Sequence, residues 1–122
     1  MLQAQAMAGG LSAIAAQALG GTIASGLTAT GTTNANALAL SQAINQFSTV
    51  AAGTGAILPT FAVPGDVVEI YNGGANALLV YPPVLGQINA LTVTTGGFSV
   101  AAGKSARFVR FGAIGWFSSL SA

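Results

Sequence analysis

Short apolar runs separated by turn residues fill the chain from about residue 34 onward. Residues 66–71 combine β-branched and aromatic residues and are bounded by Pro-Gly at 64–65 and Asn-Gly-Gly at 72–74. Residues 77–81 follow, and the Pro-Pro pair at 82–83 prevents further ladder pairing there. We therefore predict that 66–71 and 77–81 are strands that form an antiparallel hairpin across the Asn/Gly loop.

Other strand-like runs recur at short intervals on both sides of this predicted hairpin. The last two flank the Gly-rich stretch 112–115 and predict a closing hairpin. These runs are residues 35–50 (one long strand, or a strand after a short helical turn), 56–58, 91–94, 98–100, 107–111 and 116–118. Short strands with frequent turns predict an all-β fold, either an antiparallel sandwich or a small, jelly-roll-like barrel.

One short sequence segment occurs twice. The letters FSTVAAG at 47–53 return as FSVAAG at 98–103. We interpret the two copies as similar corners, each a strand followed by a tight turn at Ala-Ala-Gly, because Gly tolerates the positive φ that such turns need. Coincidence in an Ala/Gly-rich chain is the alternative, and the similarity is too short to indicate a solenoid of repeats.

The N-terminal third differs in composition from the rest. Residues 1–33 are rich in Ala and Gly, whereas all aromatic, proline and charged residues lie in 34–122. We predict an arm, 1–33, and a body, 34–122. The arm docks on a neighbouring subunit or a particle and is not needed to fold the body, because Ala and Gly bury little area to offset ordering entropy. Helical spacing predicts a short helix, with a frayed tail as the alternative, from Leu11, Ile14, Ala15, Ala18 and Leu19.

Charge is scarce in this chain. Hydrophobic residues make up 52% and charged residues 4%, compared with about 25% charged residues in an average soluble domain. Because a soluble monomer normally needs a surface of mixed charge, we expect other subunits to cover much of this one. The net charge of +1 argues against nucleic acid as a partner. Polar interruptions in the Ala-rich N-terminal stretch argue against a membrane span.

The residue types needed for common catalytic and metal sites are missing. The chain has no His and no Cys, so we predict no enzyme activity, no cofactor and no metal site. The carboxylates Asp66 and Glu69 stand three apart on a predicted strand and should diverge. We interpret them as a strand-start Asp and a solvated or paired Glu, with a calcium site across subunits as the alternative. Gly103-Lys104-Ser105 lacks the spacing of a phosphate loop, so Lys104 is interpreted as a hairpin-turn residue.

The remaining charges and the C-terminal aromatics allow two interpretations each. Arg107 and Arg110 are predicted to face opposite sides of a strand, and one of them forms an inter-subunit salt bridge with Asp66 or Glu69 or is exposed to solvent. The aromatics are predicted to lie in the core, with a sugar-stacking surface as the alternative. They are Phe108, Phe111, Trp116 and Phe117.

The body resembles a β-rich module of tailed-bacteriophage proteins over roughly residues 31–120. The similar stretches are TVAAGTGAILP, GDVVEIYNGGANALLVYPPVLGQINAL and FSVAAGKSARFVRFGAIGWFS. Members of this group are virion proteins that decorate capsids (cement proteins) or form parts of fibres. The resemblance implies a structural protein on the capsid surface, a homotrimer whose partner is the major capsid protein. The alternative it implies is a fibre or adhesin-type domain that binds a host surface glycan.

Overall fold

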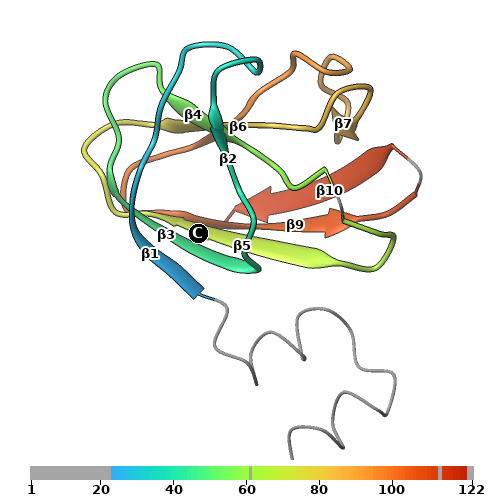
Figure 1. Ribbon diagram of the computed structural model, residues 1–122, viewed down its shortest axis with the longest axis horizontal. Helices are drawn as coiled ribbons and strands as arrows, with labels where there is room; N and C mark the ends of the chain where they lie inside the picture. Colours follow the sequence, from blue (N-terminus) through green and yellow to red (C-terminus); the bar gives the residue numbers. More distant parts are fainter. Residues whose placement is uncertain (1–22, 61, 113, 121–122) are drawn as a thin grey trace, which may run out of the picture.

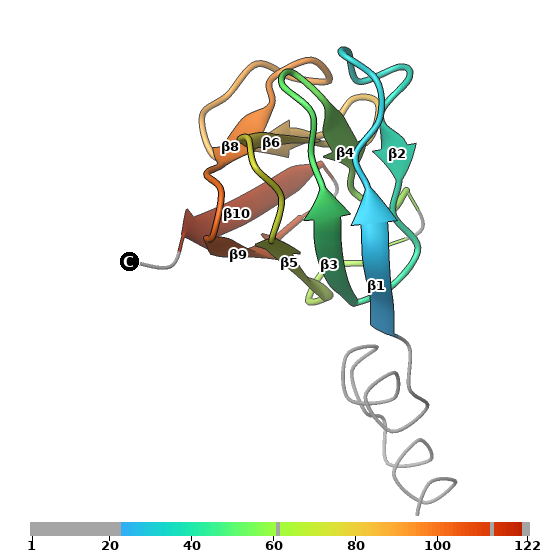
Figure 2. The ribbon, with the colours of Figure 1, turned by 90° about the vertical axis from the view of Figure 1, so that its left-hand side faces the viewer.

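The computed structural model describes residues 23–60, 62–112 and 114–120, and this part of the chain forms two β-sheets and no helix (Figures 1 and 2). One sheet has six strands in the order β1-β3-β5-β9-β10-β7, and the other has four in the order β2-β4-β6-β8. The predicted all-β class is confirmed. The strands are β1 Ile23–Thr28, β2 Leu38–Ala39, β3 Ile44–Thr49, β4 Gly55–Ile57, β5 Val67–Asn72, β6 Leu78–Tyr81, β7 Gln87–Ile88, β8 Phe98–Val100, β9 Ser105–Arg110 and β10 Gly115–Leu120.

The first six strands alternate between the two sheets along the chain. In the larger sheet β1 pairs with β3 and β3 with β5, all in parallel, and in the smaller sheet β2, β4 and β6 do the same. The chain therefore winds as a coil in which each turn adds one strand to each sheet, in the manner of a short β-solenoid. These six strands therefore do not form the predicted antiparallel sandwich or jelly-roll barrel. The sequence did not predict this winding, because it contains no long repeat.

The later strands reverse direction and complete both sheets. β8 runs antiparallel to β6, β9 runs antiparallel to β5, and β10 runs antiparallel to β9. The predicted closing hairpin is confirmed as β9 and β10, which pair from Trp116↔Arg110 to Leu120↔Ala106. The predicted strand at 91–94 is wrong, because these residues form turns and Thr94 has a φ of +68°.

The predicted hairpin of 66–71 with 77–81 is also wrong. β5 belongs to the six-stranded sheet and β6 to the four-stranded sheet, so the Asn/Gly loop crosses between sheets instead of reversing within one. Its hydrogen bonds explain the crossing. The buried Asn72 amide donates to the carbonyls of Asn76 and Val100 at 2.8 Å each and accepts the Gly74 N–H at 2.9 Å. The Asn76 side chain in turn donates to the Val50 carbonyl at 2.9 Å.

The two similar segments form matching corners, as predicted. The first joins β3 to β4 and the second joins β8 to β9, so both cross between the sheets. Gly53 and Gly103 have φ values of +79° and +77°, and in each corner the N–H of the next residue bonds the first alanine carbonyl at 3.1 Å. Lys104 follows the second corner. It therefore belongs to a connection that crosses from one sheet to the other, and not to a hairpin turn.

The core fills the space between the two sheets. Phe98 of β8 and Phe108 of β9 meet edge to face across the layers, with ring centroids 5.5 Å apart. The largest buried side chains come from both sheets and the connecting loops, which shows that the two layers share one core. They include Phe47, Leu58, Ile70, Leu78, Val80, Ile88, Val100, Phe108 and Trp116.

Part of the predicted arm belongs to the sheets. β1 lies at the edge of the six-stranded sheet beside β3, and Thr30 forms a bridge with Gly55. The boundary at residue 33 therefore falls within the folded structure. Residues 1–22, which include the predicted helix at 11–19, lie outside the described residues, so the docking of this segment stays a prediction.

Candidate functional site

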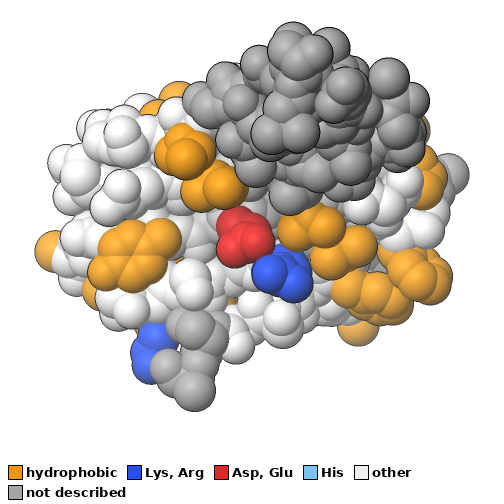
Figure 3. Space-filling view, turned by 90° about the horizontal axis from the view of Figure 1, so that it is seen from below, with side chains coloured by type: hydrophobic (Ala, Val, Ile, Leu, Met, Phe, Trp, Pro, Cys, Tyr) orange, Lys and Arg blue, Asp and Glu red, His pale blue; other side chains and the backbone are white. Residues whose placement is uncertain are grey.

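The side of the six-stranded sheet that faces away from the core carries exposed apolar side chains. Residues alternate along each strand, so that Val68 and Ile70 of β5 are buried while their neighbours point outward. We define the outer face by the outward residues of these strands, which are Ile23, Ile44, Gln46, Ser48, Val67, Glu69, Tyr71, Ser105, Arg107, Val109, Phe117 and Ser119. Figure 3 shows hydrophobic side chains gathered on both sides of one acidic and one basic side chain.

Glu69 and Arg107 form the ion pair at the middle of this face. They are register partners on β5 and β9, and Oε2 of Glu69 lies 3.2 Å from Nη2 of Arg107. The predicted inter-subunit salt bridge is thus a pair within one chain. The side chains are 46% and 61% exposed, so the pair contributes at most about 1 kcal/mol to stability. Its main consequence is that the two charges at the middle of the face neutralise each other.

Two shallow grooves flank the ion pair. The first has a volume of about 300 Å³ and is bordered by Ile44, Gln46 and Tyr71 as well as Glu69. The second, about 220 Å³, lies on the other side along Arg107, Ser119 and Leu120. Exposed apolar surface that contains a few fixed polar groups is typical of contact surfaces in soluble proteins. The outer face is therefore the strongest candidate for an interface.

The two carboxylates lie apart and have separate structural roles. Asp66 stands just before β5, where its Oδ2 accepts the N–H of Val63 at 3.1 Å, and Glu69 pairs with Arg107. This matches the interpretation of a strand-start Asp and a paired Glu. Within the described ranges no group of three or more His, Cys, Asp or Glu side chains comes together.

Arg110 lies away from the outer ion pair. Its guanidinium donates to the carbonyls of Ala62 at 2.6 Å and Gly112 at 2.8 Å, and it packs 5.8 Å from the centre of the Trp116 ring. The Arg110 N–H also donates to the Asp66 carbonyl at 2.9 Å. Arg110 thus braces the turn before β5 against the start of β10.

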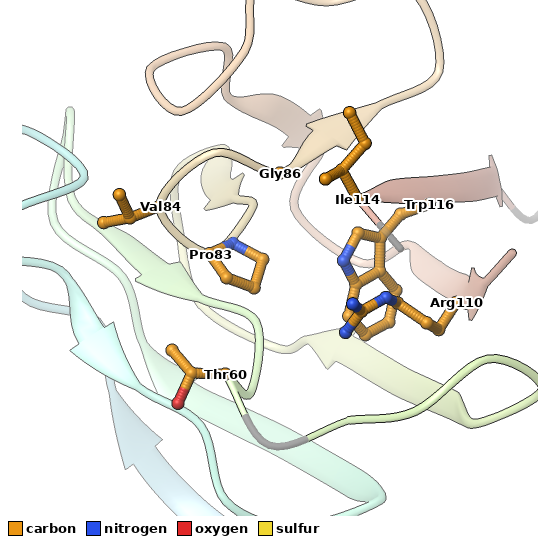
Figure 4. A pocket seen from close by; sticks show the side chains of 7 residues that line it. All are labelled: Thr60, Pro83, Val84, Gly86, Arg110, Ile114 and Trp116. Atoms are coloured by element: carbon orange, nitrogen blue, oxygen red, sulfur yellow. The ribbon is translucent and has the colours of Figure 1, made fainter. Parts of the chain in front are cut away.

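A pocket of about 300 Å³ opens beside this arginine (Figure 4). Trp116 is 1% exposed, its Nε1 has no hydrogen-bond partner, and its ring lies against Arg110. Among the residues that the structure describes, Trp116 is the one aromatic that lines the pocket, and its covered ring offers little face on which a sugar could stack. The lining residues are Thr60, Pro83, Val84, Gly86, Arg110, Ile114 and Trp116.

The four C-terminal aromatics divide between core and surface. Phe108 and Trp116 are buried as predicted, whereas Phe111 and Phe117 are 68% and 54% exposed and pack on each other with ring centroids 4.7 Å apart. Alternation along β10 accounts for Phe117, because its neighbour Trp116 points inward. Phe111 lies beyond the end of β9. Strict application of the strand period could have assigned Phe117 to the surface from the sequence.

These observations define an all-β protein of two sheets whose outer sheet face carries exposed apolar side chains around one ion pair. Comparisons with protein-family models, with curated proteins and with solved structures give no match for this chain. No helix long and apolar enough to cross a membrane occurs in the part of the chain that the structure describes.

Proposed function

We propose that this chain is a structural subunit that decorates the outer surface of a tailed-phage capsid as a homo-oligomer and stabilises the shell. The observation that carries the proposal is the outer face, where apolar side chains surround one internally neutralised ion pair. The 4% charge of the whole chain gives the same indication, since such a surface is poorly suited to remain uncovered in water. The phage setting, the trimer and the capsid partner come from the sequence resemblance.

The proposed mechanism is mechanical and not catalytic. A protein that binds the assembled shell but not its separated subunits shifts the equilibrium toward the shell by mass action. Such binding needs a surface complementary to the shell and a binding site that exists only when the shell subunits are assembled. They require no reactive side chain, which agrees with the predicted absence of enzyme activity.

Shell stability provides the direct test. Purified protein added to undecorated capsids is expected to raise the temperature at which they dissociate, followed by light scattering. Ile44→Lys and Tyr71→Lys place a charge on the outer face and are expected to weaken this effect, whereas Val84→Lys, on the exposed loop between β6 and β7, serves as the control. The proposal is contradicted if the wild-type chain neither binds the capsid nor changes its stability.

The exposed Phe111–Phe117 pair supports a second candidate, a fibre or adhesin-type domain that binds a host surface glycan. Aromatic faces contribute large, rigid contact area at low entropic cost, and both rings are more than half exposed. Screening against surface polysaccharides of candidate hosts tests this function. Binding that Phe111→Ala and Phe117→Ala abolish, together with a few copies per particle, would favour it over decoration.

A further inference from the structure

The outer face has a charge pattern that is complementary to itself. Across the β5–β9 pair, Glu69 stands beside Arg107, Val67 beside Val109 and Tyr71 beside Ser105. We propose that two copies of this chain pair through this face, about a twofold axis that runs along the strands between β5 and β9. This inference rests on the proposed function only in taking the chain to self-associate.

The axis follows from the register of the two strands. A half turn about it places β5 of one copy over β9 of the other at the same height along the strands. Each Glu69 then faces Arg107 of the second copy, each Val67 faces Val109, and each Tyr71 faces Ser105. Such an isologous contact uses one patch on both subunits and is the commonest interface among soluble oligomers.

Electrostatics disfavours a twofold axis that runs across the strands. An axis that runs across the strands through this pair would set Glu69 against Glu69 and Arg107 against Arg107. Like charges that meet in an interface oppose association, whereas alternating charges add mainly specificity. The ion pair within each chain persists in the favoured orientation, so four charges of alternating sign lie together at the centre.

The size of the face sets the strength expected of the dimer. Five strands about 4.8 Å apart and about 20 Å long give a plane of roughly 400 Å² on each copy. Stable interfaces usually bury about 800 Å² per partner. The contact is therefore weak and reversible, with a dimer that forms over the micromolar range and gains strength when copies are held on a common surface.

Charge reversal followed by mixing tests the proposal in the full-length protein. Glu69→Arg leaves two positive charges on the face, and Arg107→Glu leaves two negative charges. Each variant alone is expected to dimerise at least tenfold more weakly than wild type in sedimentation equilibrium, because like charges meet. An equimolar mixture of the two is expected to restore dimers, since a positive face then meets a negative one.

Two further variants control the experiment. The double variant Glu69→Arg/Arg107→Glu exchanges the charges within one chain and is expected to dimerise as the wild type does. Ser99→Arg adds a charge on β8, in the other sheet, and is expected to leave the dimer unchanged. Circular dichroism of every variant confirms folding. If a single reversal fails to fold, a folded double variant that stays monomeric where the wild type dimerises contradicts the proposal.

Three outcomes would overturn the proposal. They are a wild-type chain that stays monomeric, single reversals that associate as wild type, or a mixture that does not recover. A monomer would mean that residues 1–22 or another protein cover the outer face, and a trimer unaffected by the reversals would place self-association elsewhere. Capsid stabilisation by the same variants is measured separately, so failure of the dimer and failure of the decorating function give different results.

Discussion

Asn72 shows how much one side chain contributes to the path of this chain. It is fully buried at the end of β5, and its amide makes three hydrogen bonds to backbone groups of the crossing loop and of β8. Gly74 passes so close to Val50 that a Cβ would lie 2.6 Å from the Val50 nitrogen. The sequence identified an Asn/Gly loop here but not its direction, because the same residue types form hairpin turns and crossings between sheets.

Removal of the Asn72 amide is expected to destabilise the fold strongly. Asn72→Ala leaves the Asn76 and Val100 carbonyls and the Gly74 N–H without their partner, at a cost of roughly 3 kcal/mol in the free energy of unfolding. Urea denaturation measures this change. Ser99→Ala, at an exposed position on β8, is the control and should stay within about 0.5 kcal/mol of wild type. A loss below about 1 kcal/mol for Asn72→Ala would show that water replaces these bonds.

Two glycines are expected to respond differently to substitution by alanine. Gly53 has a φ of +79° and open space around it, so Gly53→Ala costs only backbone strain, about 1–2 kcal/mol. Gly53→Asn should cost less, because Asn tolerates this conformation. At Gly74 the added methyl meets backbone instead, and Gly74→Ala should cost more than Gly53→Ala. Equal urea midpoints for the two alanine variants would contradict this assignment of causes.

At the scale of elements, β1 and the parallel coil differ most from the sequence-based expectation. Most strands after β1 were recognisable from their alternation and flanking turns, although β7 was missed and β2 and β3 were not separated, and the closing hairpin of β9 and β10 was assigned correctly. Alternation does not identify a strand's neighbour, since the same pattern suits parallel and antiparallel pairing. The uncharged composition of residues 1–33 likewise concealed a strand, Ile23–Thr28, that pairs with β3 over most of its length.

Two truncations separate the strand from the segment before it. Deletion of residues 1–22 is expected to leave a chain with a β-type circular dichroism spectrum and a cooperative thermal transition. Deletion of 1–33 also removes β1 and the Thr30–Gly55 bridge and uncovers β3 as a new edge. The larger deletion should lower the melting temperature markedly, contrary to the expectation that the whole of 1–33 is dispensable for folding. If the chain that lacks only residues 1–22 cannot fold, these residues belong to the core.

For the whole molecule, the scarcity of charge decides how association is driven. The chain has only five charged residues, and two of them, Glu69 and Arg107, form an exposed pair with each other. These charges cannot supply a dominant electrostatic attraction between copies. Apolar contact must provide most of the free energy of association, while Glu69 and Arg107 select the orientation. Wild type and charge-reversal variants should therefore respond differently to salt.

Salt is expected to leave association of the wild-type chain intact. At about 1 M salt the Debye length is near 3 Å, so exposed charges are screened while burial of apolar surface is not weakened. Sedimentation velocity at low and high salt should give the same species at equal protein concentration. Self-association of Glu69→Arg should increase with salt, because screening reduces its repulsion. Dissociation of the wild type on addition of salt would show that charge drives the contact.

The all-β class, the places of most strands and turns, the two matching corners and the absence of the usual catalytic side chains could be read from the amino-acid sequence. These properties depend on local alternation, on glycine and on composition, and so they can be identified along the chain. The folded structure was needed to show that β1–β6 wind in parallel, that Glu69 meets Arg107 within one chain, and that Phe111 packs on Phe117 at the surface. Each of these depends on which strands become neighbours, and that choice is made by contacts between residues distant in sequence, such as Asn72 with Val100.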